Sequence, residues 1–176
     1  MRRALPVAAV AAIGSAVLTA CTGSAPATTV SAGPSASDPA CAAVVKSAPA
    51  TVLNAPRVEA RTPVPGVAQW GSPAIVLRCG VPPTGPTTLG CLTVNDVDWV
   101  VDPAADPIRF LTYGRQPAVE VLVPLKYGRE NATGALVDVE PVVKPLPQSH
   151  RCIGESDLTA TPASSATPAA SATTSP

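Results

Sequence analysis

The sequence has few of the side chains on which most recognisable catalytic sites depend. It contains one histidine and one methionine, aromatic residues make up 3% of it, and charged residues make up 14%. A catalytic triad needs a base beside its serine or cysteine, and His150 is the only histidine present. Phosphate-binding, dinucleotide-binding, nucleophile-elbow and His-Glu-x-x-His zinc motifs are absent. The sequence therefore predicts no cofactor and disfavours the familiar enzyme classes.

Only one long apolar segment is present, and it lies at the N-terminus. Arg2 and Arg3 are followed by residues 4–17, an uncharged and mostly aliphatic run. A membrane-spanning helix needs ~20 apolar residues, whereas a short positive region followed by an apolar run of this length is typical of a secretory signal peptide. We therefore expect residues 1–20 to direct export and to be removed.

The end of this segment predicts attachment to a membrane. Residues 18–21 read Leu-Thr-Ala-Cys, which resembles the bacterial lipobox, where a diacylglyceryl group is joined to the cysteine thiol and the signal is cut before it. We expect Cys21 to carry two or three acyl chains, because a single chain holds a protein only marginally. The alternative is a plain secretory signal with Cys21 an ordinary thiol. Acylation places the protein on the outer face of the cytoplasmic membrane.

The charge of the exported part bears on its partners. The full chain has 12 basic and 12 acidic residues, and removal of Arg2 and Arg3 leaves ten basic residues against twelve acidic ones. The net charge is then near minus two. A nucleic-acid partner normally requires a basic excess, so we expect none.

Two segments have a composition that opposes folding. Residues 21–37 and 159–176 are rich in Ser, Thr, Ala and Pro and lack aromatic and charged residues. They bury too little apolar surface to offset the entropy of ordering, so we expect a flexible tether and a disordered tail, either O-glycosylated or unmodified. Residues 38–158 remain as a single folded domain.

The other cysteines predict two disulfides. Cys41, Cys79, Cys91 and Cys152 form an even set in a chain expected to be exported, where thiols tend to be oxidised. Three pairings are possible. We favour Cys79 with Cys91, across a Pro- and Gly-rich connection, and Cys41 with Cys152, at the two ends of the domain. A zinc site is the rival interpretation, but no Cys-x-x-Cys pair is present.

The pattern of the domain predicts an α+β fold. Asp38 and Pro39 are typical of an N-cap and first helical residue, and Pro49 ends this helix. Apolar, β-branched segments predict strands, and a short helix is expected to start at Glu140. The connections are too short for parallel crossovers, so we expect a small antiparallel sheet with an N-terminal and a short C-terminal helix, stapled by two disulfides. The expected strands are residues 75–79, 98–101, 108–113, 118–123 and 136–139.

Several of these segments resemble a known family. Residues 69–82 (QWGSPAIVLRCGVP), 97–99 (VDW), 114–121 (GRQPAVEV) and 123–124 (VP) are similar to the actinobacterial domain-of-unknown-function family 3515. The likeness covers most of residues 41–152. It implies a small exported or lipid-anchored envelope protein, and the family brings no known activity to transfer.

Two groups of charged residues are candidates for a binding site. The densest group of carboxylates is Asp96, Asp98, Asp102 and Asp106, which offers oxygens to a calcium ion but lacks the EF-hand spacing. Their second interpretation is as turn residues, because two of them precede proline. The other group is Arg78, Arg109 and Arg115, since arginine pairs bidentately with carboxylate or phosphate. Alternating surface charges on a sheet predict the same arginines.

The two tryptophans also have two interpretations. Trp70 and Trp99 can stack on a sugar or a lipid head group, but in a chain so poor in aromatic residues they are better explained as core anchors. All five aromatic residues lie between positions 70 and 127, so we expect the core there.

The leading hypothesis is a binding or interaction module of the cell envelope, anchored through Cys21, with a protein or an envelope polymer as its partner. The second hypothesis is an envelope enzyme that uses the aspartate group. A deep pocket with converging carboxylates favours the enzyme. An exposed apolar patch or a shallow groove favours the module.

Overall fold

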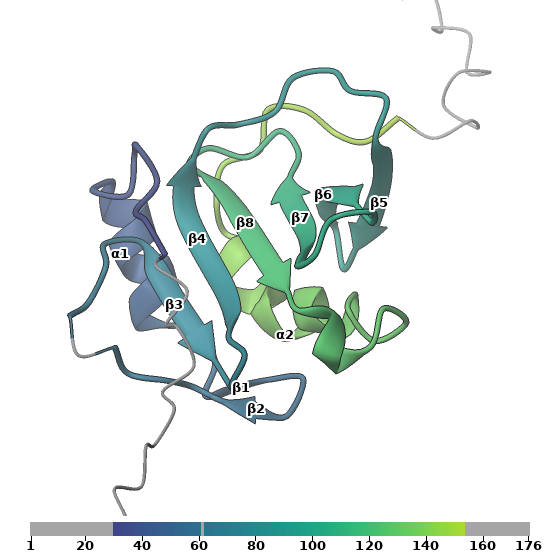
Figure 1. Ribbon diagram of the computed structural model, residues 1–176. Helices are drawn as coiled ribbons and strands as arrows, with labels where there is room; N and C mark the ends of the chain where they lie inside the picture. The colour runs from purple at the N-terminus through teal and green to yellow at the C-terminus, as the bar shows by residue number, and fades with distance from the viewer. Residues whose placement is uncertain (1–29, 61, 154–176) are drawn as a thin grey trace, which may run out of the picture.

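The computed structural model describes residues 30–60 and 62–153 (Figure 1). The expected signal peptide, Cys21 and the C-terminal tail lie outside these residues. A six-stranded antiparallel sheet has the order β3-β4-β8-β7-β6-β5, and a two-stranded sheet pairs β1 with β2. The predicted α+β class is confirmed. The strands are β1 Thr51–Val52, β2 Ala55–Pro56, β3 Val67–Trp70, β4 Ile75–Val81, β5 Gly90–Val94, β6 Val97–Asp102, β7 Ile108–Thr112 and β8 Ala118–Val123.

The N-terminal helix forms as predicted. Helix α1 spans Pro39–Lys46, and the side chain of Asp38 accepts a hydrogen bond from the Ala40 N–H at 2.8 Å. Proline at the first position costs nothing, because that N–H has no partner within the helix. The helix ends at Lys46, with Ser47 as its C-cap before Pro49, and buries Cys41 and Val44.

The C-terminal helix is longer than expected and replaces a predicted strand. Helix α2 spans Gly134–Val143 and includes residues 136–139 and Glu140, so the predicted strand is wrong. Leu136, Val139 and Val143 are buried at intervals of three and four residues, which is the period of a helix. The apolar, β-branched character of residues 136–139 extends over too few positions to decide against this longer pattern. A short 3-10 helix, Leu125–Tyr127, precedes α2.

The two faces of the large sheet have different environments. Alternate residues of β4 and β8, among them Leu77 and Val121, point toward α1 and α2 and join one core with Trp70, Trp99 and Phe110. The core includes the expected region between positions 70 and 127, but it also extends into α1, β1, β2 and the C-terminal helix. The opposite face, called here the open face, has no helix packed on it within the described residues (Figure 1).

A segment expected to be tether lies along the open face. Residues 30–36, called here the strap, run beside β4, where the Ser35 N–H donates to the Gly80 carbonyl at 2.9 Å. Gly80 has φ +81°, and a Cβ there would collide with the backbone of Ser35. The ordered domain therefore begins before Asp38, because two backbones approach closely at glycine and bury Ala36.

The two disulfides are present, but not in the favoured pairing. Cys41 is joined to Cys79, and Cys91 to Cys152. The favoured pairing of Cys79 with Cys91 is wrong because β4 and β5 are separated by β8, β7 and β6. Cys79 also points to the core beneath α1, whereas Cys91 alternates with the core-facing Leu92 and so points to the open face.

One edge of the sheet is covered by the chain itself. The Val58 N–H donates to the Gln69 carbonyl of the edge strand β3 at 2.8 Å, and the Gly71 N–H donates to the Pro56 carbonyl at 2.9 Å.

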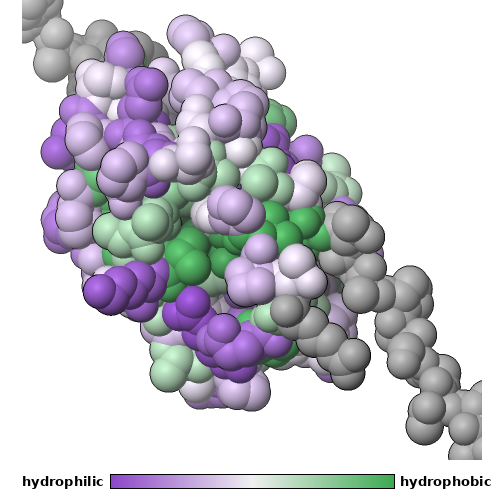
Figure 2. Space-filling model, turned by 90° about the vertical axis from the view of Figure 1, so that its left-hand side faces the viewer, coloured by the Kyte–Doolittle hydropathy of each residue, from purple (hydrophilic) through white to green (hydrophobic). Residues whose placement is uncertain are grey.

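Figure 2 looks onto the side that holds α1 and β3 and shows apolar surface in its middle, with hydrophilic groups around it. Apolar residues of this side line a small hollow of about 110 Å³, namely Val45, Val58, Val64 and Val67.

Neither α1 nor α2 is long and apolar enough to cross a bilayer, and no other α-helix occurs in the described residues.

The disulfide pairing yields the first prediction. Non-reducing peptide mapping by mass spectrometry is expected to recover Cys41 linked to Cys79 and Cys91 linked to Cys152. Replacing both members of either pair by serine is expected to lower the free energy of unfolding by about 2 to 4 kcal/mol, because the loops closed are long. A recovered Cys79–Cys91 peptide would contradict this structure.

Candidate functional site

The open face carries a buried carboxylate between two arginines. Glu120 in the middle of β8 keeps only 6% of its side chain exposed. Arg78 Nη1 lies 2.8 Å from Glu120 Oε2, and Arg109 Nε lies 2.5 Å from Glu120 Oε1. Each carboxylate oxygen therefore has its own guanidinium, which offsets the cost of burying the charge.

The strand register brings these three side chains together. Arg78 in β4 is directly opposite Glu120 in β8, and Arg109 in β7 is opposite Leu122, one step diagonally away. Residues two apart on a strand share a face, so all three lie on the open face. Arg78 also donates from Nε to the Ser31 carbonyl of the strap at 3.1 Å. The ion pairs thus hold three strands and the strap in one arrangement.

An apolar groove adjoins this cluster where β4 begins and β8 ends. Its volume is about 420 Å³, and we call it the strap groove because Val30 of the strap lines it. Val76 and Leu122 form its floor as directly opposed residues of β4 and β8. Charged groups stand at its rim, namely Asp106 and Lys126. Most of the residues that line the groove are apolar.

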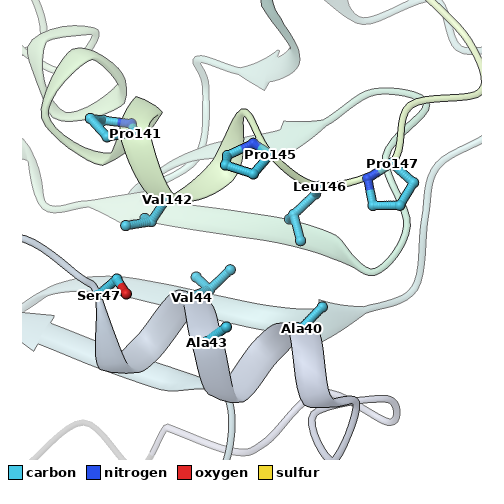
Figure 3. A pocket seen from close by; sticks show the side chains of 9 residues that line it. All are labelled: Ala40, Ala43, Val44, Ser47, Pro141, Val142, Pro145, Leu146 and Pro147. Carbon is cyan, nitrogen blue, oxygen red and sulfur yellow. The ribbon is translucent and has the colours of Figure 1, made fainter.

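A second groove lies between the two helices (Figure 3), with a volume of about 280 Å³. Ala40, Ala43 and Val44 of α1 line one side, and Val142 and Leu146 line the other. Ser47 is the only lining residue with a polar side chain. A groove of this kind offers apolar contact without a group that orients a ligand.

The predicted aspartate group does not converge on one point. Asp98 is buried and accepts hydrogen bonds from Thr93, Gln148 and the Cys152 N–H. Asp96 is exposed and pairs with Lys144 at 3.0 Å, and this hydrogen bond lowers the pKa of the Asp96 carboxyl.

The other two aspartates lie elsewhere. Asp102 accepts from the Ala104 N–H in a turn, and Asp106 borders the strap groove. Among the described residues, no three His, Cys, Asp or Glu side chains are placed to hold a metal ion.

Arg115 is separated from the other two predicted arginines. Its buried guanidinium donates to the backbone carbonyls of Lys144 at 2.8 Å, Leu146 at 2.5 Å and Asp96 at 3.2 Å. Burial lowers the pKa of the Arg115 guanidinium, and the charge of Asp98 counteracts part of this effect. Arg115 therefore secures the end of α2, where the last carbonyls of a helix lack partners within it.

The tryptophans are core residues, as the second interpretation held. Trp70 and Trp99 are fully buried. Trp70 donates from Nε1 to the Pro49 carbonyl at 2.8 Å, which fixes the segment after α1. His150 is exposed and pairs with its neighbour Ser149 through Nδ1 at 2.8 Å.

The chain matches one protein-family model over most of its length. A family model described as Protein of unknown function (DUF3515) matches residues 3–151. The chain belongs to this family. The match to the DUF3515 model spans the strap, both helices and the whole sheet. No curated protein and no solved structure matched the chain.

Sequence reasoning missed Glu120 and the strap. A glutamate between valines in the strand AVEVLV is a signal of a paired carboxylate, because an unpaired charge is rarely left inside an apolar strand. The glycine at position 33 was the signal for the strap, since a Cβ there would collide with the backbone of Gly80. Neither signal stands out without knowledge of which strands are neighbours.

The ion pairs of the open face yield the second prediction. Glu120→Gln is expected to lower the free energy of unfolding by about 2 kcal/mol, because two close arginines lose the charge between them. The control is Glu59→Gln, whose pair with Arg57 is exposed and is expected to change stability by less than about 0.5 kcal/mol. Chemical denaturation measures both. Equal effects of the two substitutions would refute the structural role of Glu120.

Proposed function

We propose that this member of the DUF3515 family is a lipid-anchored binding module of the cell envelope. Cys21 holds it on the outer face of the cytoplasmic membrane, and the strap groove takes part in binding an envelope protein or polymer. The observation that carries the proposal is the course of the strap. Val30 lines the groove, and only residues 22–29 separate Val30 from Cys21 in the sequence.

This separation sets how far the groove can be from the membrane. Nine residue steps reach at most about 30 Å when fully extended. The strap is also held against β4 at two points. The Arg78 side chain donates to the Ser31 carbonyl, and the Gly80 carbonyl accepts from the Ser35 N–H. The groove therefore lies within about 30 Å of the proposed attachment point, so envelope partners that touch the membrane are within reach.

The chemistry of the site supports binding over catalysis. The strap groove is mostly apolar, and Glu120, the nearest buried carboxylate, is neutralised by two guanidinium groups. Both carboxylate oxygens already accept hydrogen bonds from guanidinium groups, which leaves neither oxygen free to contact a substrate. The apolar floor beside charged rim residues resembles the composition of a protein-binding surface.

Acylation of Cys21 is the third prediction. After metabolic labelling with an alkyne fatty acid, the wild-type protein is expected to carry label, and mass spectrometry is expected to find a mature N-terminus at an acylated Cys21. Cys21→Ser is expected to lose the label because only a thiol forms the thioether, while Ser24→Ala is expected to keep it. An intact leader or an unacylated N-terminus in the wild-type protein would refute the anchoring.

Binding through the strap groove is the fourth prediction. A photo-reactive amino acid placed at Lys126, on the groove rim, is expected to form adducts with an envelope protein or polymer in living cells. The same group at Lys46, an exposed residue of α1, is the matched control and is expected to form fewer. Equal adducts from both positions, or none from Lys126, would contradict this role of the groove.

A further inference from the structure

The two edge strands of the six-stranded sheet, β3 and β5, differ in whether backbone covers their outer sides. The β3 edge is bonded to residues 56–58 through Val58 and Gly71. At the other end of the sheet, β5 pairs with β6 on one side, and no described residue hydrogen-bonds to its outer side. An uncovered edge strand is a template for another strand, and proteins usually blunt such edges. Among residues 30–60 and 62–153, backbone covers only one of the two edges.

The turn after β5 determines which backbone groups point outward. Asn95 and Asp96 have φ values of 48° and 66° and connect Val94 to Val97 as a two-residue hairpin turn. Val94 and Val97 are then a hydrogen-bonded pair, and such pairs alternate along an antiparallel ladder. Leu92 therefore also bonds inward to β6.

It follows that Cys91 and Thr93 direct their backbone N–H and C=O groups away from the sheet. The next strand confirms this phase, because Asp98, which is opposite Thr93, accepts from Tyr113 on the β7 side at 2.8 Å. Both outward residues are exposed. The edge therefore presents two backbone N–H donors and two C=O acceptors, at the spacing with which an extended strand forms hydrogen bonds.

Exposed apolar side chains surround this edge. Leu89, just before β5, is 43% exposed. Ile153, next to the cysteine bonded to Cys91, is 70% exposed, and both residues line a hollow of about 330 Å³ with Cys91. On the other face, α2 packs near β5 and carries the exposed Val137. A strand added at this edge would cover part of this apolar surface.

We propose that the β5 edge pairs with the β5 edge of a second copy of this chain, in an antiparallel dimer. The pairing is self-complementary. With the two-fold axis at Leu92, Cys91 of one copy is opposite Thr93 of the other, and both residues of each such pair point their backbone groups toward the partner. Two pairs give about four backbone hydrogen bonds and one continuous sheet of both copies.

We assign the β5 edge to a second copy in like-to-like pairing because the β3 edge is already covered. Head-to-tail addition of β5 to β3 would build an open filament, but residues 56–58 already occupy β3. Each copy therefore offers a single edge, and pairing of like edges closes as an isologous dimer. The floor of the strap groove is formed by β4 and β8, and β7 and β6 lie between these strands and β5, so the dimer leaves the groove free and does not depend on the function proposed above.

Sedimentation equilibrium of the purified protein at a series of concentrations tests this, as the fifth prediction. The wild-type protein is expected to be dimeric. Thr93→Pro is expected to be monomeric at the same concentrations, because proline removes the outward N–H. Thr93→Val is the matched control: it loses the same hydroxyl bond to Asp98 but keeps the N–H, and is expected to remain dimeric.

Circular dichroism reports whether Thr93→Pro folds. A second pair of variants tests the dimer without this substitution. Leu89→Lys is expected to raise the dimer dissociation constant about tenfold, since it places charge beside the edge. Val58→Lys, at 42% exposure on the covered side, is expected to leave it unchanged. A wild-type monomer at every concentration overturns the proposal, whatever else then covers β5. So does a dimer that the Thr93 and Leu89 variants leave intact.

Discussion

The disulfide between Cys41 and Cys79 joins α1 to β4 on the core side of the sheet, next to the point where the strap meets Gly80 on the opposite side. Strand β4 is therefore held from both faces at adjacent residues. The bulge between Cys79 and Val81 makes this possible, because it breaks the regular pairing with β8 and turns the Gly80 carbonyl toward Ser35. The helices, the sheet and the strap are all positioned relative to this junction.

The two faces of the sheet are stabilised by different interactions. Beneath the helices, aliphatic and aromatic side chains pack in a single core. This face is stabilised by the hydrophobic effect, which grows with the apolar area removed from water. On the open face, Glu120 and its two arginines join three strands through charge. No helix of the described residues covers the open face, and the strap groove lies there beside the ion pairs.

Local patterns predicted the elements better than their arrangement. The Asp38–Pro39 start of α1 and the strand at residues 118–123 were predicted correctly, since capping and β-branched residues act over a few positions. The disulfide pairing and the distance of Arg115 from Arg78 were not predictable, because they depend on strand order. The predicted strand at residues 136–139 is wrong because the apolar, β-branched character of four residues counts for less than the helical spacing of Leu136, Val139 and Val143.

The direction of the strap has a mechanical consequence. Val30 lies near the start of β4 and Ser35 near its end, so the strap runs parallel to β4. A pull on the N-terminal end of the chain therefore loads its contacts in shear rather than opening them one at a time. If they give way, the tension next reaches α1 at Cys41, where a covalent bond transfers it to β4. The contacts of the strap therefore take up tension before the hydrophobic core does.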